Sequence, residues 1–223
     1  MRRALLLVLA SAQLGAVAEA HGTGATITWN REISRIVYDK CASCHRPQGP
    51  AFSLTTFLDV QPRGTAVKDV VLSRQMPPWG AVKGFGQFRN DQALSQEQIE
   101  LITKWVDGGI RRGNNASMLP KMPAFTPALP FAVSSDSLLV SGRFTLVHAM
   151  ILDGLFPERV PAGRSMQVVA VMPGGHVEPL VWLHGYDDRH PHPFLFRRPI
   201  HLAAGTIIQG VPSDAALALI AAS

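Results

Sequence analysis

The chain has 223 residues, of which 47% are hydrophobic and 17% charged, a balance typical of a globular protein and not of a disordered one. Its formal net charge is +5, and the basic residues are scattered singly or in pairs such as Arg111-Arg112. Because no basic run is long enough to form a nucleic-acid arm, nucleic acid is excluded as an expected partner.

The beginning of the chain has the features of an export signal. Two arginines precede an apolar run, and an A-x-A cleavage pattern ends at Ala20. Polar residues interrupt the run, so it is short for a membrane span. We therefore expect a signal peptide at residues 1–20, cleavage after Ala20, a periplasmic mature protein, and no membrane span after cleavage.

A predicted amphipathic helix over residues 30–40 leads directly into the stretch "CASCH", which contains both cysteines of the chain. Such a pair can form a disulfide, a redox dithiol, half of a zinc site or a haem attachment site. A closed zinc site needs four ligands, and the chain has no second cysteine pair. A thioredoxin-like dithiol would follow a buried strand, whereas helix-forming residues precede this pair.

The haem interpretation uses every residue of this motif. Cys41 and Cys44 can form thioethers to the two vinyl groups of a haem c, and His45 can present its imidazole to the iron as the proximal ligand. We therefore predict one covalently bound haem at these three residues, which leaves no thiol for a disulfide.

The iron needs a sixth ligand, and the stretch "SRQMPPWG" supplies a candidate. A second predicted helix, over residues 62–74, must end before the two prolines, so Met76 is expected on a stiff, extended segment. A methionine thioether is the usual distal ligand in electron-carrying cytochromes c. Trp79 is predicted to form a flat apolar wall beside the haem, and Met118 and Met122 are rival ligands.

A third helix, predicted from Ser95 onward, completes the first half. Ser95 and Gln98 form a capping box, and a glycine pair stops the helix. Residues 28–113 resemble a monohaem cytochrome c domain of exported bacterial proteins, through "CASCHRPQGPAFSLTTF", "MPPWGAVKGFGQFRND" and "LSQEQIELITKWVDGGI". The resemblance implies that the two cysteines carry the haem, that His45 and Met76 ligate the iron, and that the protein transfers electrons in the periplasm.

The second half has the pattern of β-structure. Residues 114–131 contain four prolines and predict a stiff linker with few contacts across it. Six short alternating runs then predict a β-sandwich or open barrel, with a hairpin turn at Pro173-Gly174-Gly175. The tail at residues 213–223 predicts one short helix.

This half more faintly resembles the β-sandwich of copper-dependent, ascorbate-using monooxygenases, through "VEPLVWLHGYDDRHPHPFLFRRPIHLAAGTI". Copper would need clustered ligands, and His190 and His192 form an H-x-H pair that offers two. No paired-histidine strand of the monooxygenase type is visible, however, and the domain is about half the size needed. Docking to a partner is therefore the favoured role for this half, with copper as the alternative.

Together these patterns predict an α+β protein of two domains, with a small all-α cytochrome c domain at residues 21–113 and a C-terminal β-sandwich at residues 132–223. The expected function is one-electron transfer through haem c to redox partner proteins in the periplasm, as a carrier and not an enzyme. Two alternatives remain open. One is the haem subunit of a copper-dependent, monooxygenase-like oxidoreductase, and the other is a haem-based ligand sensor with an open iron.

Overall fold

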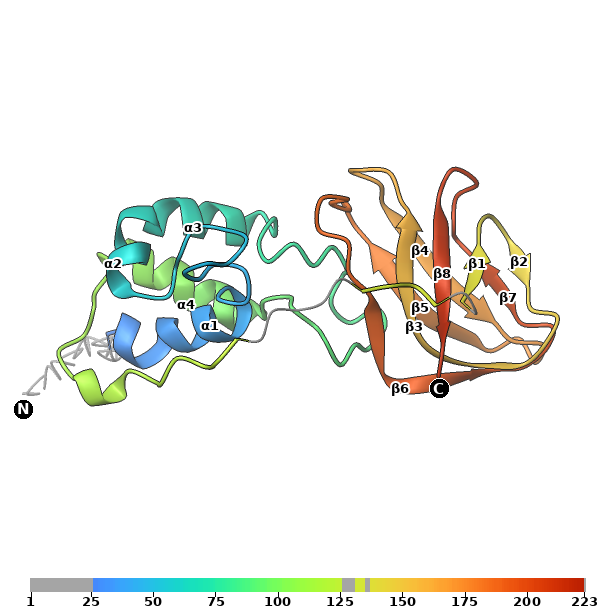
Figure 1. Cartoon of the computed structure of the whole chain (residues 1–223), viewed down its shortest axis with the longest axis horizontal. Coiled ribbons are helices and arrows are strands. Elements are labelled where there is room, and N and C mark those ends of the chain that lie inside the picture. Colours follow the sequence, from blue (N-terminus) through green and yellow to red (C-terminus); the bar gives the residue numbers. More distant parts are fainter. Residues whose placement is uncertain (1–25, 126–130, 135–136, 223) are drawn as a thin grey trace, which may run out of the picture.

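The structure is a computed structural model, and it describes residues 26–125, 131–134 and 137–222. Figure 1 shows the helices gathered at one end of the molecule and a β-sandwich at the other. The signal peptide predicted at residues 1–20 lies outside the described residues. Within the described ranges, no helix has the length and apolarity needed to cross a membrane.

The helical region, defined here as residues 26–76 and 94–113, is built from short helices around one apolar core. Its largest fully buried side chains are Trp29 and Ile33 from η1 and Ile102 and Trp105 from α4, and the indole rings of Trp29 and Trp105 lie 6.4 Å apart. The predicted capping box at Ser95 and Gln98 is confirmed at the start of α4. The helices of this region are η1 (Trp29–Ile33), α1 (Ser34–Lys40), α2 (Phe57–Val60), η2 (Gln61–Arg63), α3 (Gly64–Leu72) and α4 (Gln96–Asp107). One further helical turn, η3 (Ala116–Met118), follows the region.

Two antiparallel sheets of four strands form the sandwich. The first has the order β1-β8-β3-β6 and the second the order β2-β7-β4-β5, so β6 and β5 each lie at an edge (Figure 1). The predicted hairpin turn after β4 is confirmed, because β4 and β5 pair on either side of it. The strands are β1 (Leu138–Val140), β2 (Phe144–Thr145), β3 (Met150–Arg159), β4 (Met166–Val171), β5 (Val177–Leu183), β6 (Phe194–Leu202), β7 (Ile207–Gln209) and β8 (Ala216–Ala221).

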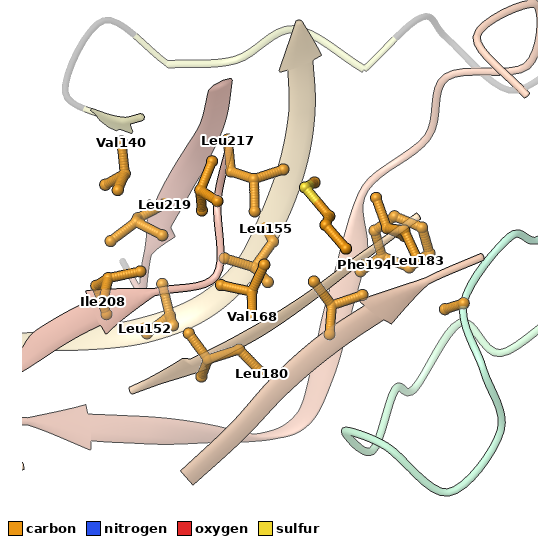
Figure 2. Packing of buried hydrophobic residues seen from close by; sticks show 14 of the residues in the cluster. Val140, Leu152, Leu155, Val168, Leu180, Leu183, Phe194, Ile208, Leu217 and Leu219 are labelled. Carbon is orange, nitrogen blue, oxygen red and sulfur yellow. The ribbon is translucent and has the colours of Figure 1, made fainter. Parts of the chain in front are cut away.

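The sandwich core is closed to solvent. Side chains from facing strands of the two sheets meet between them, as Figure 2 shows for Leu152, Val168 and Leu180. All three are fully buried. Buried and accessible residues alternate along β4, as expected of a strand with one face in a core and the other outside it.

The predicted fold class, with a small all-α cytochrome c domain as the first half, is wrong. The two four-stranded sheets dominate the described residues, and the helices are short, α4 being the longest at 12 residues. Part of the expected all-α domain also joins the β-structure, because Trp79, Ala81 and Phe88 belong to the sandwich core. Their apolar side chains are buried against strands and not against helices.

Residues 79–91, called the edge segment below, run along the β5 edge of one sheet and the β6 edge of the other. The segment forms one isolated bridge from Ala81 to Leu183 in β5 and another from Phe88 to Phe196 in β6. It supplies hydrogen bonds that an edge strand otherwise lacks. The expectation that few contacts cross from the first half to the second is therefore wrong for this segment.

The short helix predicted at the end of the chain is also absent from the described residues. Ala216–Ala221 forms β8 instead, paired with β1 on one side and β3 on the other. Alanine and leucine favour a helix locally, but pairing with two strands and burial in the sandwich decide the conformation.

Candidate functional site

The "CASCH" motif forms a tight turn at the end of α1. The Cys41 N–H donates to the Val37 carbonyl at 2.9 Å, which continues the helical hydrogen bonding. The Cys41 carbonyl then accepts from the N–H groups of Cys44 at 3.1 Å and His45 at 2.9 Å. The structure thus brings Cys41, Cys44 and His45 together in one turn.

The two thiols of this turn are free and lie in different environments. Cys41 packs against the core of the helical region, whereas Cys44 is exposed. Burial, with a smaller contribution from the neighbouring Asp39 carboxylate, raises the pKa of Cys41 to about 12. Cys41 is therefore a thiol and not a thiolate at neutral pH, and does not have the lowered pKa of a reactive redox cysteine.

The imidazole of His45 has a defined orientation. Its Nδ1 lies 2.9 Å from the Phe52 carbonyl oxygen, and its ring packs edge-on against the Phe52 ring at 4.7 Å between centroids. A carbonyl oxygen can only accept, so Nδ1 carries the proton and Nε2 keeps its lone pair. Within the described ranges, no residue forms a hydrogen bond with Nε2, which is therefore available as a ligand atom.

Apolar side chains remain uncovered in the helical region. Phe52, Leu58 and Leu72 are 55%, 73% and 51% exposed. Phe52 lies against His45, and the Arg63 guanidinium lies over its ring at 5.0 Å from the centroid. The imidazole thus has one exposed apolar ring, Phe52, beside it, which a flat, apolar cofactor could cover.

Met76 lies between the end of α3 and the start of the edge segment. Its N–H donates to the Val70 carbonyl at 3.2 Å, and its side chain is half-buried. The two rival methionines, Met118 and Met122, are 36% and 44% exposed and follow the last helix of the helical region. Met76 is thus tied to α3, whereas the Met118 carbonyl accepts a hydrogen bond from Arg35 of α1, the helix that leads into the cysteine turn.

Among the described residues, no aromatic ring that contacts Trp79 belongs to the cysteine turn. Its indole stacks on the His192 ring at 4.9 Å with an interplanar angle of 20°, and it meets Phe88 and Phe194 edge-on. It is 4% exposed and belongs to the sandwich core. The structure therefore gives Trp79 a place in the sandwich, and no described aromatic contact supports the expected role as a haem wall.

The histidines of the second half are dispersed. His190 is exposed and paired with Asp187, while His192 is largely buried against Trp79, and burial lowers its pKa. Among the residues that the structure describes, no three His, Cys, Asp or Glu side chains come together as a potential metal site. The H-x-H pair thus gains no third ligand of these types from the described chain. The remaining histidines of this half, all exposed, are His148, His176, His184 and His201.

Sequence reasoning missed two features of the site. The first is the Phe52 carbonyl, which leaves no sequence signal because every residue has one. The second is the attachment of the edge segment to the sandwich through Arg89 and Asn90. The segment has no strand-like alternation that could have signalled this, since Phe85 and Phe88 in "FGQF" lie three residues apart.

Comparison of the chain with protein-family models, curated proteins and solved structures gives no match. No relative therefore supplies an activity or a set of site residues. Inference about function rests on the turn that contains Cys41, Cys44 and His45 and on the residues around it.

Proposed function

We propose that the protein binds one haem c covalently and carries single electrons in the periplasm. The observation that supports this most is the hydrogen bond from His45 Nδ1 to the Phe52 carbonyl. Metal-bound histidines typically donate their second ring N–H to a carbonyl or carboxylate, which fixes the tautomer and the ring orientation. His45 has this arrangement directly after two free cysteines.

The two cysteines serve as the attachment points. Each thiol adds across one vinyl group of the haem: a carbon–sulfur bond forms, and the thiol hydrogen ends on the neighbouring vinyl carbon. The reaction consumes no oxidant, and it requires that the cysteines be reduced. The free state of Cys41 and Cys44 fits this requirement.

When bound, the haem iron takes up and releases one electron at a time. The chain contributes the ligands and their surroundings. His45 would hold the iron through Nε2 while its Nδ1–H stays on the Phe52 carbonyl, and the thioether of Met76 would be the second protein ligand. A methionine ligand raises the reduction potential, and apolar side chains such as Phe52 exclude water from the iron.

The ligand assignment is tested by the spectrum of the exported protein in both redox states. A thioether on ferric haem is expected to give a weak charge-transfer band at the red edge of the visible spectrum. Met76→Ala should abolish this band and lower the potential, while the matched variants Met118→Ala and Met122→Ala should keep both. Carbon monoxide binding by the reduced wild-type protein would instead indicate an open iron and favour the ligand-sensor alternative.

A further inference from the structure

We propose that the β-sandwich positions the distal ligand Met76, through the edge segment that follows it. This inference rests on the proposed function, since it concerns how that haem site keeps its sixth ligand. It assigns to Trp79 a positioning role in place of the expected direct contact with haem. It also gives the second half a part in setting the reduction potential.

The connection between Met76 and the sandwich is short and stiff. Only Pro77 and Pro78 separate Met76 from Trp79. Proline fixes its own φ angle and restricts the residue before it, so these residues can absorb little movement. A displacement of Trp79 is therefore transmitted to the Met76 backbone, which on its other side is tied to Val70 of α3.

Trp79 is the first anchor of the segment. It is 4% exposed, and its indole fits between His192 on one face and the edges of Phe88 and Phe194. Two backbone hydrogen bonds continue the attachment along β5. His184 N–H donates to the Gly80 carbonyl at 2.9 Å, and Val82 N–H donates to the Trp182 carbonyl at 2.8 Å.

The segment also approaches β5 at Gly86. This residue has a positive φ of 78°, and a Cβ added to it would lie 2.4 Å from the Leu180 carbonyl oxygen. Only glycine permits this approach. The backbone of the segment is thus packed directly on the sandwich, and not merely linked to it by side chains.

Arg89 and Asn90 form the second anchor, on β6 and on the neighbouring β3. The Arg89 guanidinium donates two hydrogen bonds to the Asp153 carboxylate, at 2.8 and 2.7 Å, and a third to the Phe196 carbonyl at 2.7 Å. The Asn90 side chain donates to the Pro193 carbonyl at 2.7 Å and accepts from the Leu195 N–H at 3.1 Å. Such bidentate contacts fix orientation as well as position.

The far end of the segment returns to the cysteine turn. The Lys40 ammonium donates to the Asp91 carbonyl at 2.9 Å, and Lys40 is the last residue of α1, directly before Cys41. The edge segment therefore begins at Trp79, close to the distal ligand Met76, and ends at Asp91, which contacts Lys40 beside the cysteine turn. Between these ends it packs on the sandwich. Both sides of the proposed iron site depend on one rigid support.

Competition by added imidazole in the ferric, haem-loaded full-length chain tests this positioning. Imidazole displaces a weakly held methionine from the iron, so its apparent affinity measures how well Met76 is kept in place. Trp79→Ala should weaken the charge-transfer band, lower the potential and raise the apparent imidazole affinity by about tenfold. Trp79→Phe, which keeps an aromatic ring in the core, should restore most of the wild-type behaviour.

A second pair of variants separates positioning from general loss of stability. Leu152→Ala removes a fully buried side chain of β3 that is not on the edge segment. It should lower the melting temperature but leave the band and the imidazole affinity unchanged. If Trp79→Ala fails to fold, Asn90→Ala combined with Arg89→Gln loosens the second anchor at the surface and should shift imidazole affinity in the same direction.

The results distinguish failure of the positioning inference from failure of the proposed function. Wild-type imidazole affinity in Trp79→Ala or in the Arg89 and Asn90 double variant, with a band that still depends on Met76, overturns the positioning inference alone. An equal shift in Leu152→Ala overturns it too, because the effect would then follow stability. A protein without covalent haem, or a band that persists in Met76→Ala, overturns the proposed ligand set and this inference with it.

Discussion

Both regions of the molecule bury an apolar core and leave some apolar side chains exposed, but they differ in what those exposed side chains lie against. The sandwich core is closed, with Leu152, Val168 and Leu180 fully buried between the sheets (Figure 2). The helical region leaves Phe52, Leu58 and Leu72 more than half exposed. The sandwich also exposes apolar side chains, such as Leu139 and Val147 at 53% and 76%, whereas in the helical region the exposed Phe52 lies against the metal-ligand candidate His45.

The edge segment belongs to one region by sequence and to the other by packing. It lies between α3 and α4 along the chain, yet Trp79 and Phe88 are buried in the sandwich. The proposed site and its support are therefore separate structures. Under the proposed function, the helical region would supply the ligands, and the sandwich would supply a rigid body against which Met76 is held.

Loss of the two cysteines should have the largest effect. The double variant Cys41→Ala, Cys44→Ala should lose all of its haem in acidic acetone, while the wild-type protein retains it because the attachment is covalent. Each single variant should retain haem through one thioether. The Cys41 variant should also be less stable than the Cys44 variant, because only Cys41 packs in the helical core. Haem release from the wild-type protein under the same extraction would contradict the attachment.

A chain truncated after Gly113 should contain a helical region that does not fold stably on its own. Without the sandwich, Trp79 and Phe88 lose their buried surroundings, at a cost of roughly 1.5–3 kcal/mol for each large side chain. We expect the truncated chain to aggregate or to unfold without cooperativity, as measured by size-exclusion chromatography and near-ultraviolet circular dichroism. A monomeric fragment with cooperative unfolding and the wild-type haem spectrum would show that the edge segment is dispensable.

Removal of the haem should affect the two regions unequally. In protein produced without haem, amide hydrogen exchange should be fast in α1 and in the loop around His45 and Phe52, since apolar surface there has no cofactor to cover it. The central strands β3 and β4 should keep their protection, because their core is complete. Equal loss of protection in both regions would contradict the expectation that haem covers apolar surface in the helical region alone.

A smaller, pH-dependent effect is expected where the two regions meet. Burial lowers the pKa of His192, so the folded protein favours the neutral imidazole. As the pH falls below about 6.5, the unfolded chain binds a proton that the folded chain does not, and stability decreases. The urea midpoint should therefore fall between about pH 7.5 and about pH 5.5, and less so in His192→Phe.

The carboxylates near His192 affect stability in a lower pH range than His192 does. Their effect can therefore be separated from that of His192. Hydrogen bonds from Arg89 lower the pKa of Asp153, so the stability from that pair is lost only at pH values below the ordinary range of a carboxylate. Asp187, which contacts His190, also has a lowered pKa and remains ionised in this window. A midpoint that falls equally in wild type and His192→Phe would assign the effect to other groups.

Local signals predicted local structure well. The capping box at Ser95 and Gln98 marks the start of α4, and the Pro173-Gly174-Gly175 turn lies between β4 and β5. The turn at Cys41, Cys44 and His45 was likewise identified from spacing within five residues. In each case the interacting residues are neighbours in the chain, so the pattern is visible in the sequence.

Contacts between distant residues were not predictable in this way. The partners of Ala81 and Phe88 are Leu183 and Phe196, about a hundred residues further along, so the segment was assigned to the helices next to it. The Ala216–Ala221 strand was predicted as a helix for the same reason, since its pairing partners lie in β1 and β3. The fold class was wrong because it added up local propensities and omitted these pairings.

The most direct test of the central proposal is the mass of the tryptic peptide that begins at Cys41 in the exported protein. Covalent haem at Cys41 and Cys44 predicts a peptide heavier by one intact haem, because thioether formation is an addition that loses no atoms. Neither thiol of that peptide should react with an alkylating reagent. A peptide at its unmodified mass with two alkylatable thiols, or at the mass of a disulfide, would contradict the proposed haem c site.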